Sequence, residues 1–364
     1  MKVVVSKKAF AETLAHVERI VPSRSPNPTL NLVRIDLRDG IMQFSGTNLD
    51  IDIRASIPAD VTGEASYAVT SQMLGQVVRA LPGDTVELSF SDTELRIASG
   101  TYVSTLQLTA AEGLSTLEFE TDLAGSIDAD QLRRVLTSVK YAAAVADFQA
   151  VFRGVKFELG NEHTRAVATD GFRLAYYHLP FTTGVESEFL ISGRSIDELI
   201  RLLGTGEVSF GLSAGQLHVQ YGEFSLNLKL MEGTLPDYNR VIPTAYPVSV
   251  TLNAALLAEA VSRVSLMSDK TSSNRVDLFV SGGELQISSE GTYGQSRESL
   301  EVMHEANDGT QLMLAYNARY LLDALGPVKD DVRLMFSGPN TAPTVINDLN
   351  DESYFAMVVP LRTN

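Results

Sequence analysis

Three residue patterns in the chain could in principle carry chemistry. The segment Gly211–Gly215 has the spacing Gly-x-Ser-x-Gly, in which Ser213 would be a nucleophile if the segment joined a strand to a helix. Asp170, which lies between Thr169 and Gly171, could act as a general acid. Histidines are the usual bases and metal ligands, and the chain has five: His16, His163, His178, His218 and His304.

The sequence around these residues favours structural roles over catalytic ones. Residues 208–210 and 216–219, on either side of the Ser213 segment, are β-prone, which predicts a hairpin and not a nucleophile elbow. Asp170 is favoured as a turn former, because an Asp side chain can accept hydrogen bonds from backbone amides two residues further on. The histidines show no metal-ligand spacing, so we expect no metal and no cofactor. A hydrolase that uses Ser213 or Asp170 stays open as an alternative.

Asp170 belongs to the stretch Ala168–Tyr177, which is the most distinctive local signature in the chain. Gly171 can adopt a positive φ without steric cost, and the aromatic, β-prone residues after it predict a second strand. The segment Gly46–Arg54 lies 122 residues earlier and again has a Thr, a turn-forming Asn and an alternating strand. The two segments indicate an internal repeat.

Composition limits the class of protein. A chain of 364 residues with 44% hydrophobic residues fits two or three globular domains. The absence of cysteine excludes disulfides and thiolate sites and is consistent with a reducing compartment. We find no signal-peptide core and no run of 18 apolar residues, and we therefore expect a soluble cytoplasmic protein. Taken alone, the net charge of −16 argues against polyanionic partners.

The first repeat is predicted to be an α+β unit of about 120 residues. Ser6 is a suitable N-cap for a helix whose apolar positions recur at three- and four-residue spacing, namely Phe10, Leu14, Val17 and Ile20. A second amphipathic helix begins at Thr70 or Ser71 and ends before Pro82. Alternating residues predict strands at 2–5, 32–37, 42–45, 50–55, 67–69, 86–90, 94–98 and 103–108.

This unit recurs twice, at offsets of 122 and then 125 residues. Apolar positions of the first helix, Phe10 and Leu14, recur as Leu132 and Leu136 and then as Leu257 and Val261. The repeat predicts three domains, 1–121, 122–244 and 245–364, joined by short polar connectors at 120–126 and 243–247. Because neither connector is a long flexible linker, we expect neighbouring domains to dock rigidly.

Three motifs, together with the threefold repeat, identify a family. Ala-Thr-Asp-Gly-Phe-Arg-Leu-Ala at 168–175, Glu-Gly-Thr-Leu-Pro-Asp-Tyr-Asn-Arg-Val-Ile-Pro at 232–243 and Val-Val-Pro-Leu-Arg at 358–362 resemble the bacterial DNA sliding clamp, the beta subunit of DNA polymerase III. The resemblance covers residues 1–362. It implies three repeated domains, each of two helices plus two antiparallel sheets (the DNA clamp fold), closing into a ring as a head-to-tail homodimer. It also implies a non-catalytic processivity factor that encircles duplex DNA. A three-domain scaffold protein that does not bind DNA stays open as an alternative, beside the hydrolase.

The resemblance further implies a peptide-binding cleft between the second and third domains. Through this cleft the family tethers the replicative polymerase, the clamp loader, other polymerases and mismatch-repair proteins, each by a short hydrophobic peptide. By motif matching, the cleft is formed here by Phe152, Thr169, Gly171, Phe172, Arg173, Leu174, Pro236, Arg240, Val241, Met357, Val359, Pro360, Leu361 and Arg362. An apolar floor with arginines at the rim suits a peptide groove. The alternative is that these apolar side chains only close the domain interface.

Motif matching also implies a dimer interface, in which Val103 and Leu106 of one subunit meet Leu266 and Met267 of the other. The sequence departs from the family pattern at three places. Phe172 stands where the family commonly has His, Asn239 stands where a basic residue is frequent, and Thr363–Asn364 extend past the usual end. These departures bear on peptide preference.

The distribution of charge supports the implied DNA-facing helices. The six predicted helices carry twelve cations and nine acids, a net +3, which leaves −19 for the remainder. At physiological salt the Debye length is about 8 Å, so a basic lining is screened from distant acidic residues. The alternative is that the polar faces of the helices carry mixed charges that only keep the protein soluble. The expected phosphate contacts are Arg24, Arg79, Arg133, Arg134, Lys140, Arg194 and Arg201.

Overall fold

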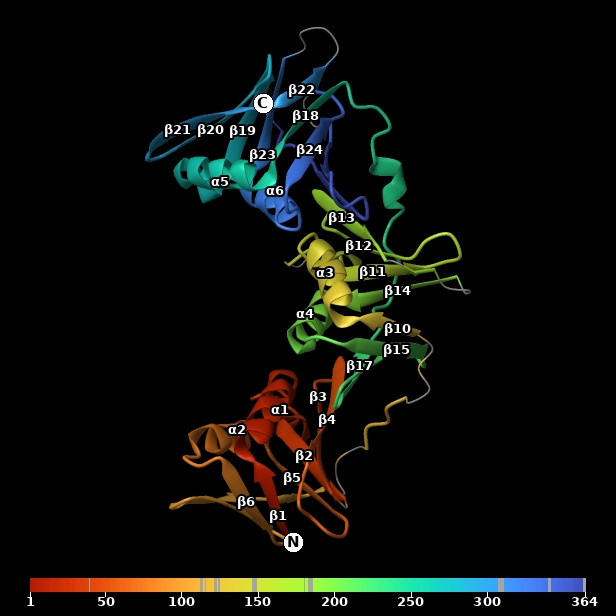
Figure 1. The fold of residues 1–364 in the computed structure, drawn as a ribbon, viewed down its shortest axis with the longest axis vertical. Helices are drawn as coiled ribbons and strands as arrows, with labels where there is room; N and C mark the ends of the chain where they lie inside the picture. Colours follow the sequence, from red (N-terminus) through yellow and green to blue (C-terminus); the bar gives the residue numbers. More distant parts are fainter. Residues whose placement is uncertain are drawn as a thin grey trace. The chain divides into compact units, whose positions relative to one another are not determined.

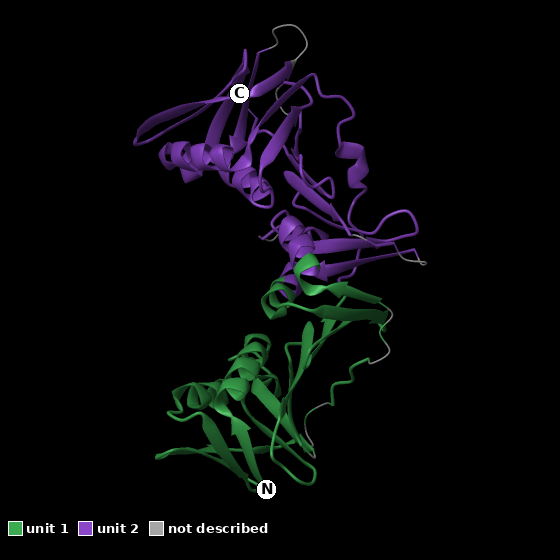
Figure 2. Ribbon diagram, viewed as in Figure 1, with its two compact units in different colours: residues 1–131, 197–230 green, residues 132–196, 231–364 purple. Residues whose placement is uncertain are grey.

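The computed structural model describes residues 1–38, 40–111, 114, 116–120, 123, 125–145, 149–179, 181–182, 186–306, 311–339 and 342–362. These residues form two compact units (Figure 2). Unit 1 consists of residues 1–131 and 197–230, and unit 2 consists of residues 132–196 and 231–364. The two units therefore divide the segment that the repeat predicts as the second domain.

Unit 1 contains two antiparallel sheets, one of nine strands and one of four. The larger sheet has the order β10 (Gly125–Asp128), β15 (Glu207–Ser213), β16 (Gln216–Tyr221), β17 (Phe224–Lys229), β4 (Ile51–Pro58), β3 (Ile41–Thr47), β2 (Leu32–Arg38), β5 (Ala65–Thr70) and β9 (Thr109–Ala110). The smaller sheet has the order β1 (Lys2–Ser6), β6 (Thr85–Phe90), β7 (Glu94–Ser99) and β8 (Tyr102–Gln107). Helices α1 (Lys7–Ile20) and α2 (Ser71–Ala80) pack against each other, and α1 covers β3 and β4 (Figure 1).

Unit 2 has the same plan. Its nine-stranded sheet has the order β14 (Ser187–Ser192), β11 (Gly154–Leu159), β12 (Arg165–Thr169), β13 (Arg173–His178), β26 (Tyr354–Val358), β25 (Thr344–Asp348), β24 (Asp331–Phe336), β18 (Val248–Asn253) and β22 (Met303–Ala306). The four-stranded sheet has the order β21 (Gly294–Glu301), β20 (Glu284–Gly291), β19 (Arg275–Ser281) and β23 (Leu312–Asn317). Helices α5 (Ala254–Val264) and α6 (Ala318–Leu325) lie side by side (Figure 1).

Short helices and two further α-helices complete the described chain. The 3-10 helices are η1 (Pro28–Asn31), η3 (Ala150–Arg153), η4 (Tyr238–Val241), η5 (Ser265–Met267) and η6 (Lys270–Ser272). Helices α3 (Ala129–Lys140) and α4 (Gly193–Leu202) each contribute residues to both units. Each predicted repeat therefore holds two α-helices, as the periodicity predicts.

Each nine-stranded sheet joins strands from two neighbouring repeats. In unit 1, β17 pairs with β4, and Asn227 lies opposite Asp52. In unit 2, β13 pairs with β26, and Leu174 lies opposite Met357. These two strand pairs explain why the middle repeat is divided, because each of its sheets is continuous with a sheet of a neighbour. The short connectors predicted rigid docking, and strand pairing is its physical basis within each unit.

The predicted elements agree with the observed ones to within a few residues. Phe10, Leu14, Val17 and Ile20 are all buried on α1, and the helix begins after Ser6, although the Ser6 side chain makes no capping hydrogen bond. The segment Gly211–Gly215 is the β15–β16 hairpin, as predicted. An α+β fold with antiparallel sheets is thereby confirmed.

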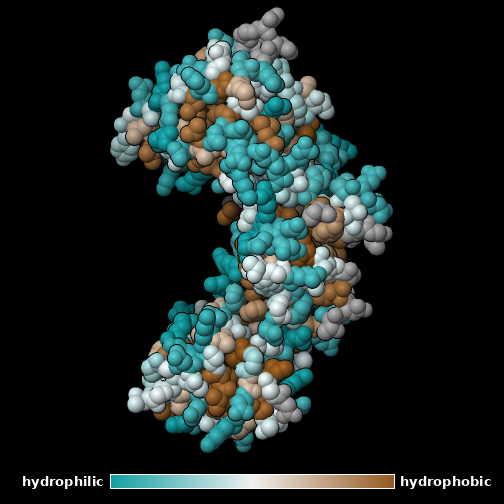
Figure 3. Space-filling model, viewed as in Figure 1, coloured by the Kyte–Doolittle hydropathy of each residue, from teal (hydrophilic) through white to brown (hydrophobic). Residues whose placement is uncertain are grey.

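Apolar side chains are largely gathered inside the sheets and helices. The face drawn in Figure 3 is mostly hydrophilic, with hydrophobic residues in separate clusters. Among the described residues, no helix combines the length and the apolar character that crossing a membrane requires. Likewise, no group of three or more His, Asp or Glu side chains within the described residues could hold a metal ion.

Candidate functional site

The turn between β12 and β13 is held by its own side chains. The Thr169 hydroxyl donates to the carbonyl of Arg173 (2.7 Å) and accepts from the amide of Gly171 (3.1 Å). The Asp170 carboxylate accepts from the amides of Phe172 (2.9 Å) and Arg173 (3.0 Å). Gly171 has φ of +87°. The predicted roles of Asp170 as a turn former and of Gly171 as a positive-φ residue are confirmed.

The strand after this turn enters the core of unit 2. Leu174 and Met357, which lie opposite each other on β13 and β26, are 1% and 3% exposed. They belong to a buried cluster that also includes Leu235 and Tyr238, against which Phe152 packs. Two of the expected cleft residues are therefore core residues, and their substitution would disturb folding as well as binding.

Most of the remaining expected peptide contacts lie nearer to the surface. Phe172 is 59% exposed and Val241 is 54% exposed. The amide of Val359 donates to the carbonyl of Phe172 (2.8 Å), and the amide of Leu361 donates to the carbonyl of Ala315 (2.7 Å), so the C-terminal segment is fixed beside the turn. We call the accessible residues the docking surface: exposed Gly171, Phe172, Pro236, Arg240, Val241 and Arg362, with half-buried Phe152, Val359 and Leu361. Thr169 and Pro360 are buried behind it.

Arg173 does not lie at the rim, contrary to the expectation from the sequence. Its side chain is 9% exposed and forms ion pairs with Asp170 (3.0 Å) and with Asp323 of α6 (2.5 Å). Its guanidinium also stacks over the rings of Tyr141 (5.6 Å) and Tyr320 (4.4 Å). Because its guanidinium contacts two carboxylates and two aromatic rings, Arg173 holds the turn against α6. Few of its N–H groups remain for binding a ligand.

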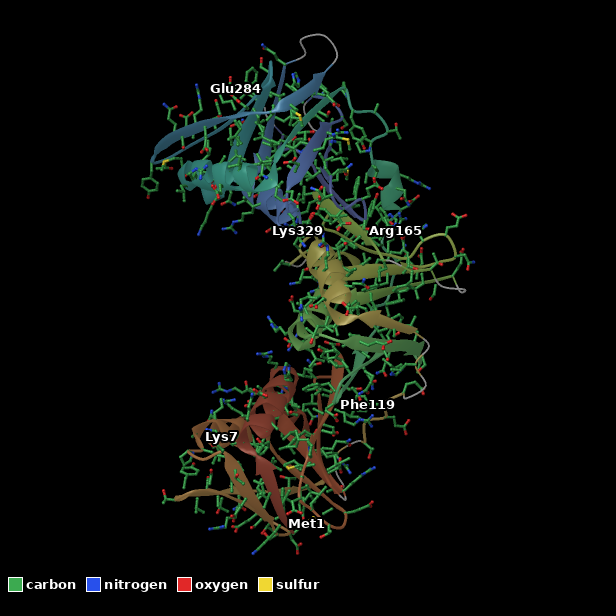
Figure 4. All side chains as sticks on the ribbon, in the orientation of Figure 1. Met1, Lys7, Phe119, Arg165, Glu284 and Lys329 are labelled. Carbon is green, nitrogen blue, oxygen red and sulfur yellow. The ribbon has the colours of Figure 1, made fainter. Side chains whose placement is uncertain are left out.

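A buried ionic network positions one side of the docking surface, and no sequence pattern predicted it. The Tyr238 hydroxyl donates to the Glu158 carboxylate (2.9 Å), and Tyr238 opens the 3-10 helix that carries Arg240 and Val241. Arg165, labelled in Figure 4, pairs with Glu158 and lies over the Tyr238 ring (5.1 Å). A cavity of about 630 Å³ borders these residues. The sequence motif at 232–243 contains Tyr238, and this motif is the signal from which the network could have been predicted.

This network changes the titration of Glu158. Burial alone raises the pKa of Glu158, but hydrogen bonds from Lys156, Arg165 and Tyr238 outweigh burial, and the net pKa lies below its ordinary value. A carboxyl group whose folded-state pKa is depressed stabilises the fold above its unfolded pKa. That contribution is lost as the pH falls through the folded pKa.

Replacing Glu158 with Gln should therefore lower the stability of unit 2 at neutral pH by much more than at acid pH. The parent is expected to approach the variant as the pH falls through the depressed folded-state pKa of Glu158, because its own carboxyl group then becomes protonated. Urea unfolding at pH 7 and at an acid pH below that folded-state pKa measures the two differences. Glu284→Gln, at an exposed position of β20, is the control and should change stability little at either pH. If the loss of unfolding free energy in Glu158→Gln is as large at acid pH as at pH 7, the ionised Glu158 carboxylate does not stabilise unit 2 as we infer.

The seven expected DNA contacts have different surroundings. Arg79 pairs with Glu18, Arg201 with Glu198 (2.5 Å) and Arg134 with Asp351 (2.6 Å). Arg24 and Arg194 are exposed, and neither forms an ion pair within the part of the chain that the structure describes. Arg133 and Lys140, on α3, are half-buried. The paired arginines must give up a carboxylate to contact a phosphate, so Arg24 and Arg194 are the cations most available to an anion.

The expected dimer residues lie at two sheet edges. Val103 is 50% exposed and Leu106 is half-buried on β8, the edge strand of the four-stranded sheet in unit 1. Leu266 is 76% exposed on η5, which packs against β20 and the edge strand β21 in unit 2. Met267, beside it, is half-buried. Exposed apolar residues at unpaired edges are suited to pairing with a second chain.

Ser213 belongs to a chain of side-chain hydrogen bonds that its sequence pattern did not predict. Its hydroxyl lies 2.8 Å from Nε2 of His218, and Nδ1 of His218 lies 2.8 Å from Oδ1 of Asn227. The order Ser213, His218, Asn227 resembles the hydrogen-bonded triad of a hydrolase. However, the residues after Ser213 form a turn into β16, so no helix N-terminus follows the serine to bind an oxyanion. We interpret the arrangement as a polar ladder on the sheet.

Comparisons with known proteins agree along the whole chain. Models of the DNA polymerase III beta subunit match in order: the N-terminal domain at residues 1–120, the central domain at 126–237 and the C-terminal domain at 239–362. The beta sliding clamps of Caulobacter vibrioides and Pseudomonas putida are 29% and 27% identical to this chain, each over 100% of both chains.

Solved structures show the same likeness. A DnaN sliding clamp of Pseudomonas aeruginosa, bound to griselimycin, has a TM-score of 0.92 and 26% identity, with 100% of both chains covered. The DNA polymerase sliding clamp of Bacillus subtilis has a TM-score of 0.94 over 100% of both chains, and at 24% identity that likeness concerns the fold.

Proposed function

The chain belongs to the DNA polymerase III beta subunit family, the bacterial sliding clamps, and from this membership we propose that it is a processivity clamp. As a homodimeric ring it encircles duplex DNA and tethers the replicative polymerase, and it catalyses no reaction. The observation that carries this function is the ordered match of all three domain models to one chain. The hydrolase alternative loses its support, because Ser213 lies in a hairpin.

The three clamp domains span residues 1–121, 122–244 and 245–364 in this proposal. The recurrence of two α-helices within each range supports the division. The absence of cysteine is compatible with the reducing cytoplasm, where bacterial replication takes place, and we place the protein there.

The docking surface in unit 2 binds the short hydrophobic peptides of the polymerase, the clamp loader, other polymerases and mismatch-repair proteins. Phe172 and Val241 offer exposed apolar area, and the buried cluster beneath them gives a rigid base. Arg240, whose side chain is 83% exposed, and the exposed Arg362 can bind peptide carbonyls or carboxylates. Because Phe172 is more apolar than the His common in the family, we expect apolar residues to be preferred beside it.

Duplex DNA is bound through phosphates and without sequence readout. A protein that slides must make contacts that every sequence offers, and phosphates are the same at every step. Arg24 and Arg194 are the strongest candidates, since both are exposed and unpaired among the described residues.

Salt should distinguish direct binding from encirclement. Binding to a short linear duplex should weaken with a log–log slope of about −0.9 per phosphate contact. After loading on nicked circular DNA, the protein should instead survive the same salt, because a closed ring cannot leave without opening. Gel filtration of the loaded DNA in rising salt, compared before and after linearisation, measures both. Equal salt sensitivity on circular and linear DNA would remove the encirclement model.

Ring closure uses the two unpaired sheet edges. We place β8 of one chain beside β21 of a second copy, which would extend the two four-stranded sheets into one. Val103 and Leu106, whose side chains lie on opposite faces of β8, would then lie at one interface with Leu266 and Met267 on η5. Two-fold symmetry repeats this contact, so one substitution acts at both interfaces of the ring.

A further inference from the structure

We propose that unit 1 contains a second peptide-binding groove, which takes a segment with a Lys or Arg side chain next to an apolar residue. It goes beyond the proposed function, which uses only the docking surface of unit 2. The groove lies at the turn between β3 and β4, the position in unit 1 that corresponds by the repeat to the turn between β12 and β13.

The two turns share three hydrogen bonds from backbone amides to side chains. The amide of Leu49 donates to the Thr47 hydroxyl (2.9 Å), as the amide of Gly171 donates to Thr169. The side-chain oxygen of Asn48 accepts from the amides of Asp50 (3.0 Å) and Ile51 (2.8 Å), as Asp170 accepts from the two amides after Gly171. The backbone of the turn in unit 1 is therefore held by side-chain hydrogen bonds in the same way as the turn beside the docking surface.

Leu49 stands where the other turn has Gly171. Its φ is +77°, close to the +87° of Gly171, yet leucine is disfavoured in this left-handed region. Its side chain is also 66% exposed, so core packing does not offset the strain. Strained backbone combined with an exposed apolar side chain is typical of a binding site. Leu49 is therefore the residue from which we infer a ligand.

A cavity of about 300 Å³ adjoins Leu49. Four half-buried leucines line it: Leu30, Leu32, Leu114 and Leu117. Leu30 and Leu114 correspond by the 122-residue offset to Phe152 and Pro236 of unit 2. The wall at Leu117 is fixed, because the carbonyl of Glu118 accepts from Asn227 (2.8 Å) and Arg54 lies over the ring of Phe119 (4.5 Å; Figure 4 labels Phe119).

One residue that lines this cavity, Asp52, differs from its counterpart in unit 2 in a way that selects the ligand. Where unit 2 pairs the apolar Leu174 and Met357, unit 1 pairs Asp52 and Asn227. The Asp52 carboxylate accepts from the Thr47 hydroxyl (2.6 Å) and from the Asn227 amide (3.2 Å). It forms no ion pair with any cation among the described residues.

Arg34 also lines the cavity, but its guanidinium is paired with Asp36 (2.9 Å). The cavity is also lined by the polar residues Asn27, Thr29, Ser45 and Thr47. A carboxylate without an ion pair beside leucines fits a Lys or Arg side chain, whose aliphatic stem packs on the apolar surface while its charge meets the carboxylate. A partly exposed pair of this kind is worth up to about 1 kcal/mol, or roughly fivefold in affinity.

The test uses the full chain and a fluorescein-labelled hexapeptide, Ser-Leu-Arg-Leu-Ser-Gly, with the same peptide carrying neutral citrulline in place of Arg as its matched control. By fluorescence anisotropy the parent should bind the Arg peptide about fivefold more tightly than the citrulline peptide. Asp52→Asn, which keeps an acceptor for Thr47, should make the two affinities equal. Leu49→Gly, which suits the positive φ, should keep the protein folded and weaken both peptides severalfold.

A Val241→Asp variant separates this groove from the docking surface of unit 2. It should bind the Arg hexapeptide normally while losing a peptide of the type Gln-Leu-x-Leu-Phe, which represents the short hydrophobic peptides that the docking surface is proposed to bind. If the hexapeptide binds the parent, Asp52→Asn and Leu49→Gly equally, or does not bind the parent at all, the second groove is overturned. If only the Gln-Leu-x-Leu-Phe peptide fails on the parent, the proposed function of unit 2 fails and the groove in unit 1 stands.

Discussion

Val241→Asp should abolish binding of a Gln-Leu-x-Leu-Phe peptide while the protein stays folded and dimeric. Val241 is 54% exposed, so the new charge does not enter the core of the free protein. When a hydrophobic peptide covers it, the carboxylate loses water without gaining a partner, and we expect at least a 30-fold loss of affinity, about 2 kcal/mol. Fluorescence anisotropy with a labelled peptide measures the loss, and circular dichroism monitors the fold.

Val145→Asp is the matched control, because Val145 is also in unit 2 and is 94% exposed. It should bind the peptide with parental affinity. Deleting residues 360–364 is a second route to the same loss, although Pro360 is buried and part of that effect would be structural. Parental affinity in Val241→Asp would move the peptide site away from the docking surface.

Leu266→Ala combined with Met267→Ala should convert the dimer to a monomer. Truncating two interface side chains at about 2 kcal/mol each raises the dissociation constant roughly a thousandfold, and the two-fold repeat of the contact applies that loss at both interfaces of a ring. Sedimentation velocity at nanomolar to micromolar concentration gives the association state. Neither side chain is buried in the chain described here, so the monomer should remain folded.

Leu256→Ala combined with Met303→Ala serves as the control for this pair. Both side chains are exposed, at 56% and 68%, and neither lies on η5 or on an edge strand of the four-stranded sheets. This variant should remain dimeric. A dimer that persists at nanomolar concentration in Leu266→Ala with Met267→Ala would show that the ring closes elsewhere.

Local chemistry made part of the site predictable from sequence. The roles of Asp170 and Gly171 follow from residues within the same turn, and the structure confirms both. The hairpin at Ser213 was predictable for the same reason, since β-prone residues flank it on both sides. Periodicity over the three repeats predicted the helices, because many independent positions agree at fixed offsets.

Long-range partners made the rest unpredictable. Arg173 was expected at the rim, and it is buried because Asp323, 150 residues away, pairs with it. Leu174 and Met357 have side chains that suit a peptide floor and a core equally well, and only their burial decides between the two. Ser213 and His218 are near each other in the sequence and form a hydrogen bond. His218 is also bonded to Asn227, and Asn227 is held by Asp52 of the first repeat, which the sequence could not predict.

The strand pairing that joins neighbouring repeats also sets a constraint on synthesis. Asn227 pairs across to Asp52, 175 residues earlier in the chain. At about 5–20 residues per second, the ribosome delivers β17 roughly 10–35 seconds after β4 has emerged. During that interval the first repeat presents an unpaired sheet edge with alternating apolar residues, the form of nascent chain that chaperones bind and that aggregates when they do not. Ribosomes that pause between the two strands should therefore lower the yield of native protein more than equal pauses after Lys229.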